Sequence, residues 1–82
     1  MTSEQKAGLA RLLLRLPFQR GPIRQFALTA AGRDCCESYE LAWVAEQFWA
    51  RSLAKHARDI HAEYQALIIE LEDEAKLNLH RT

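Results

Sequence analysis

The chain has 82 residues, 49% of them hydrophobic, with only three glycines and two prolines. This composition is too apolar for a disordered chain and too poor in turn residues for a small all-β fold, so we expect one small helical domain over residues 1–82. The net charge is zero, which argues against a uniformly basic nucleic-acid-binding domain. The charge is nevertheless segregated: residues 1–33 carry six basic residues against one acidic residue, and residues 34–82 carry five against ten. This asymmetry predicts attraction between the two halves or to an oppositely charged partner.

Residues 3–16 are predicted to form an amphipathic helix. Thr2, followed three positions later by Gln5, can cap its first N–H groups, as can Ser3 alone. Pro17 ends the helix, because proline has no N–H and disfavours helical geometry in the residue before it. The leucines that share its apolar face are Leu9, Leu12, Leu13 and Leu16.

Residues 22–31 can be read as a strand or as a helix, and the helix is favoured. Pro22 stands where a first helical residue is expected, and Gly32 stands where a left-handed C-terminal cap is expected. Ile23 and Phe26 recur at helical spacing, whereas the alternation that a strand needs is poor. The strand alternative stays open at this point.

The stretch FALTAAGRD, residues 26–34, has Leu-Thr followed by Gly-Arg. It resembles the wing-to-helix junction of winged-helix transcription regulators. The resemblance implies a DNA-binding wing followed by a long dimerisation helix. It implies no particular DNA-contacting residue, because only one helix fits before residue 26, whereas that family has three helices before its wing.

Residues 34–82 contain neither glycine nor proline and are predicted to be a long acidic helix, with Asp34 as its N-cap and Glu37 completing a capping box. A continuous helix would be about 70 Å long. It must therefore either pair with a partner or break, and residues 54–59 are the expected break. Apolar residues recur in heptad fashion along it, which predicts a homodimer. The expected dimer interface consists of Leu53, Ala57, Ile60, Tyr64, Leu67 and Leu71. The predicted fold is therefore all-α, with two short N-terminal helices packed on one long or broken C-terminal helix.

Residues 39–50 are apolar nearly all round, so they must be covered on more than one side. Leu41, Val44 and Phe48 form a second apolar stripe in addition to the heptad. Aromatic residues and arginine are the types most enriched at binding hot spots. The expected protein-binding residues are Tyr39, Trp43, Phe48 and Trp49, with Arg20 and Arg24 from the basic half.

Reactive chemistry is not expected, and we predict neither catalytic residues nor a cofactor or metal. Cys35 and Cys36 are adjacent and are read as small core residues. His56, Asp59 and Glu63 share a helical face but have no second ligand set, so a solvated face is expected. The chain has no phosphate-binding loop and no nucleophile elbow, which argues against an enzyme.

The expected function is that of a small protein-binding regulator or inhibitor that occludes a partner protein, of a bacterial, phage or mobile-element type. We expect a cytoplasmic location and no membrane association, since the N-terminal apolar run is interrupted by Arg11 and Arg15 and no stretch suits a bilayer span. The alternative is a reduced winged-helix or helix-turn-helix DNA-binding regulator, in which the basic half contacts phosphates. Its candidate residues are Arg11, Arg15, Arg20, Arg24 and Arg33.

Overall fold

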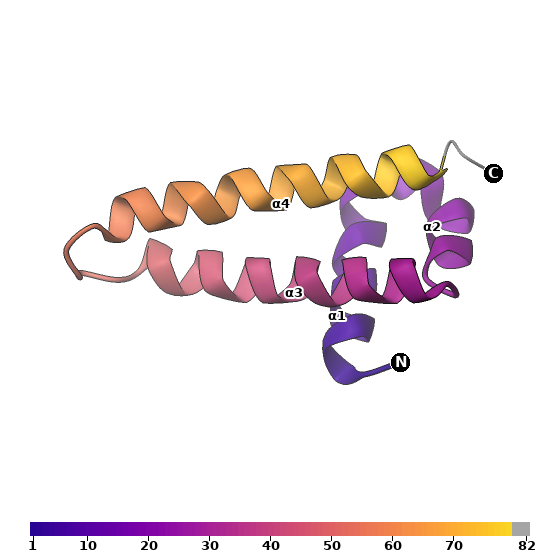
Figure 1. Cartoon of the computed structure of the whole chain (residues 1–82), viewed down its shortest axis with the longest axis horizontal. Helices are drawn as coiled ribbons and strands as arrows, with labels where there is room; N and C mark the ends of the chain where they lie inside the picture. The colour runs from indigo at the N-terminus through magenta and orange to yellow at the C-terminus, as the bar shows by residue number, and fades with distance from the viewer. Residues whose placement is uncertain (80–82) are drawn as a thin grey trace.

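A computed structural model describes residues 1–79 and shows an all-helical chain. Two long helices, α3 (Ala30–Ala50) and α4 (Ala57–Leu79), run antiparallel as a hairpin, which makes the molecule 44 Å long. Helix α1 (Ser3–Arg15) crosses α3, and α2 (Arg20–Phe26) lies at the end of the hairpin opposite its loop (Figure 1). A short 3₁₀ turn, η1 (Pro17–Gln19), joins α1 to α2. No strand occurs among residues 1–79, and none of the described helices is both long and apolar enough to cross a membrane.

Helix α1 confirms the first prediction and its capping. The Thr2 hydroxyl accepts a hydrogen bond from the Gln5 N–H at 3.1 Å, and the Gln5 side chain accepts one from the Thr2 N–H at 3.0 Å. This reciprocal pair satisfies two N–H groups that the helix itself leaves unpaired. The helix ends at Arg15, two residues before Pro17, as proline geometry requires.

The junction between α2 and α3 corrects two predictions. The helix expected over 22–31 ends at Phe26, and Gly32 lies in the first turn of α3 rather than at a C-terminal cap. The N-cap is Thr29, not Asp34: its hydroxyl accepts from the Gly32 N–H at 2.9 Å and donates to the Phe26 carbonyl at 2.7 Å. Because residues 26–34 form a helix–turn–helix corner, the wing reading is also wrong.

Gly32 has a packing role at this corner. A Cβ atom there would lie 1.8 Å from the Phe26 carbonyl oxygen, so any other residue would force α2 and α3 apart. The glycine therefore permits a close approach of two backbone segments, which is a different reason for glycine than a left-handed cap.

The long C-terminal helix is broken, and a continuous helix is thereby excluded. Residues 51–56 connect α3 to α4, so the break overlaps the predicted segment 54–59 only in its first half. His56 adopts a left-handed φ of 68°, a conformation that usually selects glycine or asparagine. Because a histidine occupies this position and no glycine or proline occurs in the connection, the sequence shows no conventional turn signal here.

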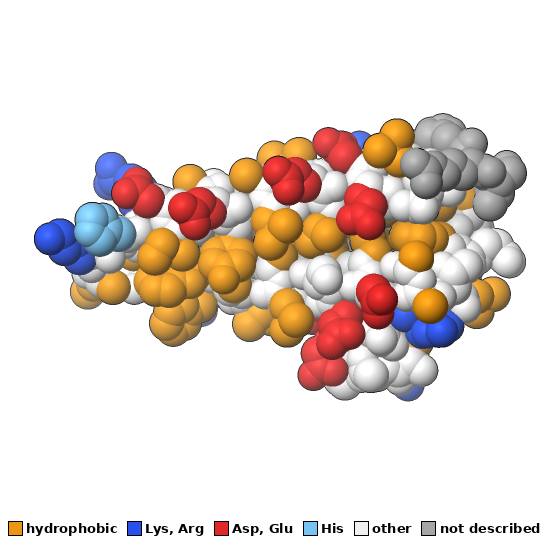
Figure 2. Space-filling view, in the orientation of Figure 1, with side chains coloured by type: hydrophobic (Ala, Val, Ile, Leu, Met, Phe, Trp, Pro, Cys, Tyr) orange, Lys and Arg blue, Asp and Glu red, His pale blue; other side chains and the backbone are white. Residues whose placement is uncertain are grey.

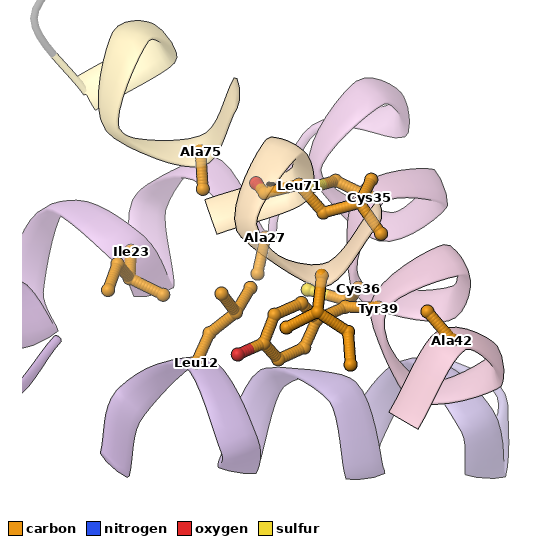
Figure 3. Close-up of a cluster of buried hydrophobic side chains, with 10 residues drawn as sticks. Leu12, Ile23, Ala27, Cys35, Cys36, Tyr39, Ala42, Leu71 and Ala75 are labelled. Atoms are coloured by element: carbon orange, nitrogen blue, oxygen red, sulfur yellow. Dashed lines mark hydrogen bonds between the residues drawn. The ribbon is translucent and has the colours of Figure 1, made fainter. Parts of the chain in front are cut away.

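The hydrophobic core lies where α1, α2, α3 and α4 meet, at the end of the hairpin away from its loop (Figures 1 and 3). Leu12 and Ile23 come from the N-terminal helices, whereas Tyr39 and Ala75 come from the hairpin, and all four are almost fully buried. Helices α1 and α3 approach so closely that a Cβ on Gly8 would lie 1.8 Å from the Cys36 carbonyl oxygen. The N-terminal helices thus fix one end of the hairpin and leave the other end projecting.

Candidate protein-binding surface

The structure separates the residues predicted to bind a partner. Tyr39 is fully buried in the core, so its assignment to a contact surface is wrong (Figure 3). Trp43 is half-buried. Phe48 is exposed and meets the half-buried Trp49 edge-on, with ring centroids 5.1 Å apart. Arg20 and Arg24 belong to α2, at the far end of the hairpin from the loop. The six residues therefore do not form one patch.

The predicted dimer stripe is used largely within one chain. Ala57 and Leu71 are buried in the hairpin, and Ile60 and Tyr64 are half-buried. Leu67 is more exposed, and Leu53 is fully exposed in the 51–56 loop. A heptad on a single helix shows that a partner helix is needed, and here α3 of the same chain is that partner. Four of the six residues of this stripe are thus buried or half-buried within one chain, so they offer little surface to a second copy of the chain.

The basic half is also engaged within the chain. The Arg11 guanidinium donates to Glu40 at 2.6 Å and lies 5.1 Å from the ring centre of Trp43. Arg15 donates to Glu72 at 3.0 Å, and Arg33 to the Leu28 carbonyl at 2.8 Å. Of the five arginines proposed to contact DNA, only Arg20 and Arg24 have side chains with neither a hydrogen bond nor an ion pair within residues 1–79.

Glu72 links three helices through one buried carboxylate. Its Oε2 atom accepts from the Tyr39 hydroxyl at 2.5 Å and from Arg15 Nε at 3.0 Å. Burial, reinforced by the hydrogen bond to Glu72, raises the pKa of Tyr39 to about 12. The same carboxylate raises the pKa of Arg15 by accepting its hydrogen bond. This cluster is a structural tie between α1, α3 and α4.

The other candidate reactive groups form no site. Cys35 and Cys36 are buried, as predicted, and burial raises the pKa of the Cys35 thiol to about 12. No group of three or more metal-ligating side chains occurs among the described residues. Sequence reasoning missed the contact of His61 with Glu46 at 2.6 Å across the hairpin. Its partners are 15 positions apart, and nothing in the sequence pairs them until the position of the turn is known.

An uncovered apolar face on α3 is the feature that stands out. Leu41, Val44 and Phe48, which we call the α3 stripe, are 55%, 54% and 64% exposed. Their spacing of three and four residues puts them on one side of the helix, between the side that packs on α1 and the side that packs on α4. In Figure 2 hydrophobic side chains line the boundary between α3 and α4, and further groups of them lie at the edge of α3 away from α4. The sequence had identified these three residues as a second stripe that needs a cover.

The two ends of the α3 stripe carry opposite charges. Glu37 precedes Leu41 by four residues and lies on the same face of α3. Arg51, the C-cap residue that follows α3, comes three residues after Phe48, which is the spacing of that face. Neither side chain has an ion pair or hydrogen bond within residues 1–79, whereas Glu40 and Glu46 on the same helix are paired with Arg11 and His61.

No known protein family, curated protein or solved structure matches this chain.

Proposed function

We propose that this protein is a small protein-binding regulator that inhibits by covering the surface of a partner protein, with the α3 stripe as the contact face. The observation that carries the proposal is that three large apolar side chains lie side by side on one helix face and no described element covers them. Single exposed apolar residues are normal on a protein surface, whereas a contiguous apolar row is typical of an interaction site.

The shape of the molecule supports recognition through a helix face. The α3 stripe runs along α3, which belongs to a hairpin 44 Å long whose core end is fixed by α1 and α2. A face on a helix that is already folded loses less conformational entropy on binding than a segment that must fold as it binds. Helix faces with apolar side chains at three- and four-residue spacing commonly dock into grooves or against other helices.

The proposal is tested by a charge placed in the α3 stripe. We expect Leu41→Glu to abolish capture of a specific partner from the native host, because a carboxylate would be buried without a counter-ion in the complex. The matched control is Ile69→Glu. Ile69 lies inside α4 and is 57% exposed, nearly the same as Leu41, but it is not part of the α3 stripe.

Capture is measured with the tagged protein, and bound chains are identified by mass spectrometry after crosslinking. The informative protein is one that the wild type and Ile69→Glu retain and Leu41→Glu loses. Occlusion is then tested by adding the chain to that purified partner and measuring the partner's own binding or activity. Equal capture by the wild type and both variants would remove the α3 stripe from the function.

A further inference from the structure

We propose that the α3 stripe also binds a second copy of this chain, with the two α3 helices antiparallel. This inference rests on the proposed function, in that it takes the α3 stripe to be a protein-binding face. It names one occupant of that face and its orientation. It places the homodimer contact on the outside of α3, not on the heptad residues that close the hairpin.

The spacing along the α3 stripe is that of a helix–helix seam. Counting from Glu37 to Arg51, the residues on this face follow one another at intervals of four, three, four and three. This alternation is the a and d pattern that keeps one face of a helix against a second helix. The seam is apolar in its centre and ends in a single acidic and a single basic residue. They are, in order, Glu37, Leu41, Val44, Phe48 and Arg51.

The charges make this seam complementary to itself in one orientation. Glu37 lies seven residues before Val44 and Arg51 lies seven residues after it. A two-fold axis through Val44 therefore brings Glu37 of each copy opposite Arg51 of the other, with Leu41 beside Phe48 of the second copy. A parallel pair would instead place Glu37 against Glu37 and Arg51 against Arg51. Isologous contacts of this kind are the commonest way in which identical chains associate.

The monomer gives independent reasons to expect a second copy. A chain of 82 residues buries only about 60–65% of the surface of its unfolded state, so added contact area would increase its modest stability. The side chains of Glu37 and Arg51 have no ion pair or hydrogen bond within the described part of the chain, so pairing them disrupts no existing side-chain contact. A contact through one helix is smaller than the ~800 Å² per partner of a standard interface, so we expect a dimer that dissociates on dilution.

The test is a charge exchange at the two ends of the seam. Glu37→Arg and Arg51→Glu each replace two attractive contacts with two repulsive ones in the antiparallel dimer. We expect each to weaken dimerisation by about tenfold or more at low salt. The double variant Glu37→Arg/Arg51→Glu should recover wild-type association. An equimolar mixture of the two single variants should form a one-to-one heterodimer, because each copy then meets the opposite charge.

Association is measured by analytical ultracentrifugation over a range of protein concentrations, with circular dichroism to confirm that every variant is folded. A wild type that remains monomeric at millimolar concentration overturns the proposal. So does a dimer that the single charge exchanges leave unchanged, since that is the result for a parallel or different contact. The orientation stands only if both single variants weaken the dimer and the double variant restores it.

The outcome also separates this inference from the proposed function. If the wild type is monomeric but Leu41→Glu still loses its host partner, the homodimer is refuted and the function stands. If the charge exchange behaves as described but Leu41→Glu captures the same host proteins as the wild type, the homodimer stands and the function is refuted.

Discussion

At the scale of single residues, the buried carboxylate of Glu72 connects three helices through its hydrogen bonds. It is 7% exposed and receives two donors, the Tyr39 hydroxyl from α3 and the Arg15 guanidinium from α1. A buried carboxylate without donors would be strongly destabilising, whereas one with charge-assisted hydrogen bonds fixes the geometry of its neighbours. Glu72 therefore sets the relative positions of α1, α3 and α4 as well as filling space.

Removing the Tyr39 hydroxyl should change how stability depends on pH. The pKa of Tyr39 is raised to about 12, above the ordinary value near 10. The folded protein thus holds the phenolic proton more tightly than the unfolded chain does. Its stabilising contribution is complete below about pH 10 and is lost as the pH rises towards 12. We expect the free energy of unfolding to fall more steeply over this range for the wild type than for Tyr39→Phe.

The measurement is urea denaturation followed by circular dichroism at several pH values from 7 to 11. At neutral pH, Tyr39→Phe should be less stable by about 1–3 kcal/mol, since Glu72 loses one buried donor. The buried thiols of Cys35 and Cys36 titrate in both proteins and cancel in the difference. Parallel stability curves for the two proteins above pH 10 would show that the tyrosine proton is not held by the fold.

Which residues are buried could be predicted only where one helix face decides the matter. Leu12 lies on the predicted apolar face of α1 and is buried. The adjacent cysteines, Cys35 and Cys36, were predicted to be core residues and are also buried. Tyr39 was assigned to the surface because tyrosine is one of the residue types most enriched at binding hot spots. Its burial depends on Glu72, 33 positions away, and a single sequence does not show that pairing.

At the scale of elements, the crossing of α1 over α3 depends on a glycine inside a helix. Glycine at such a position lowers helix stability by about 0.5–1 kcal/mol relative to alanine, so its presence needs a packing reason. At Gly8 that reason is the Cys36 backbone, whose carbonyl oxygen occupies the space of a side chain. The contact is with backbone atoms, so no rotamer change can relieve it.

We expect Gly8→Ala to destabilise the protein by about 2–4 kcal/mol, because the two helix axes must separate and the core around Leu12 opens. The matched control is Gly21→Ala in α2, where nothing lies within 4 Å of the added Cβ. The control should be neutral or slightly stabilising, in line with the higher helix propensity of alanine. Thermal or urea unfolding measures both. A Gly8→Ala protein as stable as the control would mean that the helices do not cross this closely in solution.

The elements themselves were predictable where local chemistry acts alone. The capping box at Thr2 and the proline at 17 fixed the first helix to within one residue. At the second junction, Pro22 and Gly32 satisfied a local rule that the fold does not use, because Gly32 serves the close approach of α2 and α3. The turn at 51–56 has no glycine or proline and includes His56 in a left-handed conformation. Burial of α4 against α3 therefore stabilises a turn that local propensity does not favour.

At the scale of the whole molecule, two features organise the fold: basic and acidic residues lie in different halves of the chain, and the hydrophobic core lies at one end of the hairpin. Arg11 and Arg15 of the basic half pair with Glu40 and Glu72 of the acidic half, so part of the asymmetry is internal attraction. The core residues of the hairpin fall within residues 35–42 of α3 and 68–75 of α4. Towards the loop, the two helices depend mainly on each other and on the contact between His61 and Glu46.

This uneven packing predicts two tiers of local stability, measurable by native-state hydrogen exchange with mass spectrometry in a dilute, monomeric sample. Amides of residues 44–50 and 58–66 should exchange faster than those of residues 36–42 and 69–75, because opening the loop end exposes far less apolar surface than unfolding the core. His61→Ala should accelerate exchange near the loop and leave the core amides almost unchanged, since only the contact across the hairpin is lost. If all four segments instead exchange at one common rate, the hairpin opens only with the core as a single cooperative unit. The projecting end, including the Phe48 side of the α3 stripe, is then as rigid as the core.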